Sequence, residues 1–186
     1  MRAALESSDK SAFVGRLPGM DLRLIPFRHN LWATRAQLDV CRALTDEQFR
    51  RRFEIGCGNL HDTFVHIIGA MDRWADRIAG VPLPPRNENP ARRTVDELCA
   101  MLDAAANKLE AVARRIIDDN RVDEMMEFPL PDGQPPHRFH RSTALVHVTT
   151  HGMHHRAQVF NMLRQLGVKQ TFDGDAVEWE LFVNEY

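Results

Sequence analysis

The sequence predicts an all-α protein, a four-helix bundle with a short loop or hairpin inserted before the last long helix. Apolar residues recur at three- and four-residue steps over long segments, which is the period of an amphipathic helix. Capping residues precede several of these segments, and Gly or Pro follows them. No segment shows the convincing period-two alternation of a half-buried strand. Four long helices with linkers between them therefore favour a bundle.

The chain should begin with an extension that is only loosely attached. Residues 1–19 end in Leu17-Pro18-Gly19 and carry scattered apolar residues, so we expect the bundle domain to span residues 20–186. Its first helix should start near Met20 and run for about six turns. The apolar residues with helical spacing there are Leu24, Phe27, Leu31, Leu38 and Cys41.

Capping signals divide the middle of the chain. Thr45 with Gln48 forms a capping box for a short helix, and Asn59 is a cap for a long one that carries apolar residues as far as Ile78. Gly80 and the prolines after it should end that helix.

The second half of the chain should hold two more long helices. Thr94 opens a helix of about residues 95–119. Residues 120–140 are rich in proline and predict a loop or a small hairpin with its turn at Asp132-Gly133. The last long helix should span about residues 142–166, closed by Gly167.

Composition excludes several classes of protein. The 186 residues are 44% hydrophobic and 27% charged, as in a single soluble globular domain. A net charge of −2 gives no cationic surface for nucleic acid, so we expect no nucleic-acid partner. No apolar run approaches the roughly 18 residues that span a bilayer, and the N-terminus lacks a secretory core. We therefore expect a cytoplasmic protein with no membrane partner.

The cysteines predict neither a disulfide framework nor a cysteine zinc site. Cys41, Cys57 and Cys99 are an odd number and show no CxxC spacing. Reduced thiols agree with a cytoplasmic protein.

The chain has nine histidines, and four of them lie on the last long helix. At about 100° per residue, His151 and His155 fall within its apolar stripe, so we expect both rings to point into the core. His147 falls at the edge of that stripe and His154 points more nearly to solvent. The pair at i and i+4 could share a metal ion, or each ring could have its own hydrogen-bond partner. Gly152 follows His151, so the glutamate of an HExxH metalloprotease is absent.

Three segments of the chain resemble one known family. Residues 147–158, HVTTHGMHHRAQ, are similar to the HxxHHRGQ-type signature of the DinB/YfiT-like superfamily of metal-binding four-helix bundles. Residues 29–35, HNLWATR, and residues 66–74, HIIGAMDRW, are similar to its N-x-W-A-N/T-x and H-x-x-x-A-x-x-x-W segments. The resemblance covers about residues 20–170, with the three segments in the family's order.

The resemblance implies a third ligand that spacing alone did not select. In the family one histidine of the second long helix joins two of the last, and the matching positions are His66, His151 and His155. It also implies one divalent metal ion, which is zinc, nickel or iron, with a coordination position left open. Ala157 replaces the family's usual glycine, and Met71 stands where many relatives have an acidic residue.

Several functions remain open on this basis. The resemblance implies a metal-dependent enzyme that activates a small thiol, as a transferase or isomerase would. A metal-dependent hydrolase that uses metal-bound water is an alternative. A non-catalytic stress-response protein with a structural metal is another. The expected partner is a small molecule, a low-molecular-weight thiol in the first case. Trp32 and Trp74 are expected in the core or in a homodimer interface.

Overall fold

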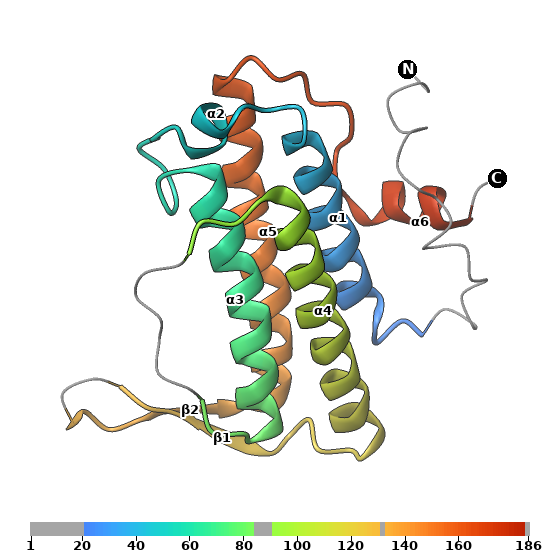
Figure 1. Cartoon of the computed structure of the whole chain (residues 1–186). Helices are drawn as coiled ribbons and strands as arrows, with labels where there is room; N and C mark the ends of the chain where they lie inside the picture. The colour runs from blue at the N-terminus through green and yellow to red at the C-terminus, as the bar shows by residue number, and fades with distance from the viewer. Residues whose placement is uncertain (1–20, 84–90, 131–132, 185–186) are drawn as a thin grey trace.

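A computed structural model describes residues 21–83, 91–130 and 133–184, and the expected extension, residues 1–19, lies outside this part. The elements in chain order are α1 (Ile25–Cys41), α2 (Asp46–Arg50), α3 (Leu60–Ala79), α4 (Val95–Asp118), β1 (Met125–Phe128), β2 (His137–His140), α5 (Arg141–Gln165) and α6 (Ala176–Asn184). The long helices α1, α3, α4 and α5 run side by side (Figure 1). Helices α1 and α3 each pack against both α4 and α5, so the predicted all-α bundle is confirmed.

The first helix is shorter than the sequence suggested. It has 17 residues, or about five turns, where we expected about six. Pro26 lies in its first turn, and proline fits that position because the first backbone N–H groups of a helix have no partner within it. The helix therefore begins at Ile25, after the Leu24 cap, rather than near Met20.

Both predicted capping boxes are present. The Thr45 side chain accepts a hydrogen bond from the Gln48 backbone N–H, and the Gln48 side chain accepts one from the Thr45 backbone. Thr94 and Glu97 make the same reciprocal pair at the start of α4. Each box satisfies two N–H groups that a helix start would otherwise leave without partners.

The predicted limits of α3 are also confirmed. The Asn59 side chain accepts from the Asp62 backbone N–H at its start. Gly80 closes it with a left-handed φ of 78°, a conformation that costs glycine little. These two caps fix the register of α3, and thereby the level at which its side chains face α5.

The proline-rich segment before α5 forms a hairpin, one of the two forms expected for it. Strands β1 and β2 pair antiparallel, with Met126 opposite Phe139. Asp132 of the expected turn lies outside the described residues. Phe128 and Phe139 lie against Trp74, at ring-centroid distances of 5.8 and 6.2 Å. The hairpin thus covers the buried Trp74 of α3, in agreement with a packing role for that residue.

Helix α6 was not predicted. It lies beside α1, away from α3 (Figure 1), and buries Trp179 with Trp32 and Phe172 in a second hydrophobic cluster. Nine residues give too few turns for a periodic pattern to be recognised. Tertiary contacts of its aromatic side chains stabilise it instead.

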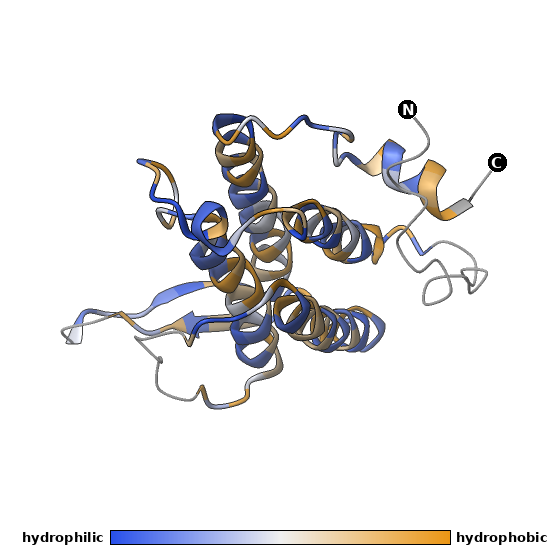
Figure 2. Cartoon of the chain, turned by 45° about the horizontal axis from the view of Figure 1, so that its top comes forward, coloured by the Kyte–Doolittle hydropathy of each residue, from blue (hydrophilic) through white to orange (hydrophobic). Residues whose placement is uncertain are grey.

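The main core fills the space between the four long helices. Seen with its top turned forward, the bundle shows hydrophobic segments facing one another and hydrophilic ones facing outward (Figure 2). Leu38, Phe64, Leu102 and Val148, one from each long helix, are at most 1% exposed. In the described part of the chain, no helix is long and apolar enough to cross a membrane.

Candidate metal centre

Three imidazole rings meet where α3 lies against α5. The ring centroid of His66, on α3, lies 4.8 Å from that of His151 and 4.5 Å from that of His155, both on α5. The centroids of His151 and His155 are 4.5 Å apart, one helical turn along the same face. The structure therefore brings together the three residues that the family resemblance implied.

The nitrogen positions suit a small cation. The Nε2 atoms of His66 and His151 are 3.0 Å apart. Two imidazoles on one tetrahedral metal, each with a bond of about 2.0–2.1 Å, would place their nitrogens about 3.3 Å apart. The observed separation is close to that value.

Gln158 sets the tautomer of His155. The Nδ1–H of His155 donates to Gln158 Oε1 at 2.8 Å, which leaves the lone pair on Nε2. The Gln158 amide nitrogen lies 2.9 Å from His154 Nε2 and donates to it. In many proteins a metal-binding histidine is oriented by a hydrogen bond from its second ring nitrogen, like the one from His155 Nδ1 to Gln158. His154 is exposed.

The pair on α5 is not in the core, contrary to our expectation. His151 and His155 are partly buried and His66 is exposed, so the cluster lies at the edge of the bundle. At this level of α5 the inward positions belong to Gly152 and Arg156, which are both buried. The two histidines are one residue before them, about 100° around the helix, and so face α3 rather than the interior.

A buried polar layer lies behind the cluster. The Arg156 guanidinium, 5% exposed, donates to Asn30 Oδ1 and, at 3.4 Å, to Thr34 Oγ1 on α1. A Cβ on Gly152 would overlap Asn30 Oδ1, so the close approach of α1 to α5 requires glycine there. Desolvation lowers the pKa of Arg156 to about 10, which still leaves it cationic at neutral pH. Arg156 therefore acts within the bundle.

The histidines are held in the form that binds metals. Desolvation, followed by the neighbouring imidazoles of His155 and His66, lowers the pKa of His151 to about 4. Desolvation also lowers the pKa of His155, although the Gln158 hydrogen bond opposes the shift. Both rings are neutral at physiological pH, and a neutral imidazole is the metal-binding species.

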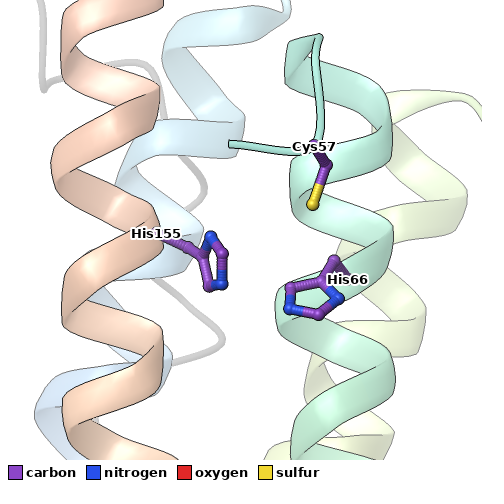
Figure 3. Close-up of side chains that lie close together, drawn as sticks. All are labelled: Cys57, His66 and His155. Atoms are coloured by element: carbon purple, nitrogen blue, oxygen red, sulfur yellow. The ribbon is translucent and has the colours of Figure 1, made fainter. Parts of the chain in front are cut away.

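The loop between α2 and α3 brings a fourth candidate ligand to the cluster. Cys57 Sγ and ring nitrogens of His66 and His155 all lie within 4.8 Å of one another. The Cys57 side chain points from the loop towards His66, and His155 faces both from α5 (Figure 3). The spacing of the cysteines in the sequence did not suggest this group. The sequence held no signal for it, because the loop and α5 meet only in the folded chain.

The loop backbone is closely fixed. The Phe53 N–H donates to Gly58 O at 2.8 Å, and the Gly58 N–H donates to Ile55 O at 3.0 Å. Gly56 and Gly58 have φ values of 57° and 88°, which residues with a Cβ rarely adopt. Residues 52–58 also line a hollow of about 470 Å³.

The Cys57 thiol is half-buried in this loop. Burial raises its pKa, as does the nearby charge of Asp62, while a hydrogen bond with Thr63 acts in the opposite direction. The thiol is therefore protonated when no cation is bound.

His147 extends the row of rings along α5. Its ring centroid lies 5.6 Å from that of His151 and 4.8 Å from that of Trp74. The ring is exposed, and the row His147, His151, His155 follows the i, i+4, i+8 spacing of one helical face. His147 therefore flanks the cluster on the side of the hairpin.

Comparison with known proteins agrees with the fold. The sequence model of the DinB family matches residues 23–179, which includes all three histidines and Cys57. Among curated proteins, none matches the chain. The family match and the histidine–cysteine group together support a metal-binding protein. The chain belongs to the DinB family.

Proposed function

We propose that the chain binds one divalent metal ion through His66, His151 and His155 and activates a small thiol for transfer to an electrophile. The observation that carries this proposal is the convergence of three imidazoles from two helices, with centroids 4.5–4.8 Å apart, at the exposed edge of the bundle. Zinc, nickel and iron are all suited to imidazole ligands.

The chain's own residues support a site with a position for substrate. Three imidazoles leave one position of a tetrahedral ion for another ligand. A bound cation would supply the charge that keeps a thiol deprotonated at neutral pH. His66 is exposed, so a small molecule can approach from outside the bundle. The hollow of about 470 Å³ is lined by residues 52–58, which include Cys57 and none of the three histidines.

The reaction we propose needs only the thiol and an electrophile, with no oxidant or reductant. The thiol sulfur forms a bond to an electrophilic carbon, and the leaving group departs with the electron pair of its bond to that carbon. The thiol proton goes to solvent. Gln158 holds the His155 ring in one tautomer throughout, since its amide bonds both His155 and His154. Thiol transfer uses a nucleophile that the cation makes available at neutral pH.

A thiol-transfer assay tests the proposal. Metal-loaded and apo protein are compared with a panel of cellular thiols and chlorodinitrobenzene, from which the thiol displaces chloride. We expect a rate that rises with metal occupancy, is lost in His155→Ala and is retained in His154→Ala. Turnover of an ester or amide, with no thiol-dependent rate above the apo protein, would replace the transferase with a hydrolase.

The position of Cys57 favours a second candidate, a metal that only stabilises the fold. A protein thiolate added to three imidazoles would make a closed four-ligand site, as in structural zinc centres. This candidate predicts that metal removal lowers the melting temperature while no substrate is turned over. A thiol-dependent rate in the assay above would exclude it.

A further inference from the structure

We propose that Cys57 is a fourth protein ligand of this metal, and that it holds the coordination position an incoming thiol must take. The inference rests on the proposed metal at His66, His151 and His155. It adds that the resting site is closed by the chain's own thiolate, which an external thiol displaces. The carrying observation is the grouping of Cys57 Sγ with nitrogens of His66 and His155 within 4.8 Å.

The distances from Cys57 Sγ to ring nitrogens of His66 and His155 permit coordination after a small side-chain movement. A zinc–sulfur bond of about 2.3 Å and a zinc–nitrogen bond of about 2.0 Å place sulfur and nitrogen about 3.5 Å apart in a tetrahedron. The largest separation in the group, 4.8 Å, exceeds this by little more than 1 Å. Rotation about the side-chain bonds of Cys57 or of the exposed His66 can close that gap without moving a helix.

The loop presents the thiol in a defined direction. Its two left-handed glycines and the hydrogen bond from Phe53 to Gly58 fix the backbone on both sides of Cys57. A Cβ on Gly56 would overlap Gln158 Oε1, the atom that accepts from His155. The loop therefore packs against the same glutamine that orients His155, which couples the thiol position to that of the ring.

The same geometry makes this ligand the one that can leave. The three histidines are on helices of the bundle, whereas Cys57 is on a loop that lines the hollow. In the exchange, an incoming thiol gives its proton to the Cys57 sulfur and takes its place on the cation, and Cys57 releases that proton to solvent when it returns to the cation after transfer. One metal–sulfur bond breaks and one forms, and no oxidant or reductant is required.

Cobalt(II) provides a readout that does not depend on activity, because thiolate ligation gives an intense near-ultraviolet charge-transfer band. Cobalt-loaded wild-type protein should show this band without added thiol. Cys57→Ser should lose the band, still bind one cobalt ion, and bind it at least about tenfold more weakly, because even residues outside the ligand set change affinity by that factor. Cys99→Ala is the matched control, since Cys99 is 4% exposed in the core, and it should keep the band.

The exchange step has its own measurement. Adding 2-mercaptoethanol to cobalt-loaded Cys57→Ser should restore the band, because the position is then open to an external thiolate. Absence of restoration would overturn the exchange.

The outcomes separate this inference from the proposal on which it rests. Stoichiometric cobalt in wild-type protein without a charge-transfer band overturns the Cys57 ligand and leaves the histidine site intact. Failure of wild-type protein to bind cobalt overturns the proposed function itself.

Wild-type protein provides a test even if the variants fold poorly. Zinc loading should change the rate of alkylation of Cys57 by iodoacetamide at least tenfold, as followed by peptide mass spectrometry, because coordination replaces the protonated thiol by a metal-held thiolate. Equal labelling of Cys57 in zinc-loaded and apo protein would overturn the inference.

Discussion

His61 and His66 lie five residues apart on α3 and differ in what surrounds their ring nitrogens. His61 is 2% exposed, donates from Nδ1 to Asp62 Oδ1 at 2.8 Å, and accepts at Nε2 from the Arg93 backbone N–H at 3.1 Å. Both nitrogens of His61 thus have a protein partner. His66 is exposed, and its Nε2 faces the Nε2 of His151 at 3.0 Å.

The partners of the ring nitrogens make His61 a structural histidine and His66 a candidate metal ligand. A buried imidazole with one donor contact and one acceptor contact is satisfied within the protein. Nitrogens that face one another can share at most one proton, whereas a cation can accept lone pairs from all of them. The environment of the ring nitrogens, rather than the number of histidines, therefore identifies the site.

The largest expected effect is the loss of the metal. His151→Ala and His155→Ala should each abolish stoichiometric metal binding, and His66→Ala should weaken it strongly, because each removes a proposed ligand. His154→Ala should leave metal binding intact, since that ring is exposed and its Nε2 bonds the Gln158 amide. Elemental analysis of protein purified without a histidine tag measures this. Undiminished metal in both α5 variants would refute the assignment.

Chelation should have the next largest effect. A ligand that binds only the folded state, present at a hundredfold excess over Kd, stabilises it by about 2.7 kcal/mol. Metal removal should therefore lower the melting temperature of wild-type protein, as followed by circular dichroism. The His155→Ala variant should have the same melting temperature with chelator as without it. Identical wild-type curves after verified removal would count against a bound metal.

Gln158→Ala should give a smaller change. It removes the acceptor that keeps the His155 proton on Nδ1, and the loss of such a hydrogen bond typically weakens metal affinity about 10–100-fold. Competition with a chromophoric chelator measures the affinity. Unchanged affinity would mean that the Gln158 contact does not orient the ligand.

His61→Ala should have the smallest effect on the metal and a clear effect on the fold. Removal of the ring leaves the partly buried Arg93 N–H without its acceptor, and a hydrogen bond lost in this way costs about 0.5–1.5 kcal/mol. We expect a lower free energy of unfolding in urea with the metal content of wild-type protein. Loss of metal in this variant would remove the distinction between His61 and His66.

Local signals predicted most of the fold. Helix limits at Thr45, Asn59 and Thr94 depend on hydrogen bonds within a few residues, so the sequence contains all the information they require. Helix α6 depends on contacts between Trp179 and Trp32, far apart in the chain, and sequence periodicity does not detect such contacts.

The site was predicted only in part for the same reason. The spacing of His151 and His155 is local to α5, whereas their position at the edge of the bundle depends on Gly152 and Arg156 packing against Asn30 of α1. Cys57 reaches the cluster through a loop conformation that no short motif encodes. Family resemblance identified His66, but it did not indicate a neighbouring thiol.

X-ray absorption at the metal edge of zinc-loaded protein tests the central claim most directly, because it counts imidazole ligands around the ion. The account predicts three imidazole nitrogens at about 2.0–2.1 Å, with one sulfur at about 2.3 Å from Cys57. A spectrum with fewer than three imidazoles would contradict the ligand set of His66, His151 and His155.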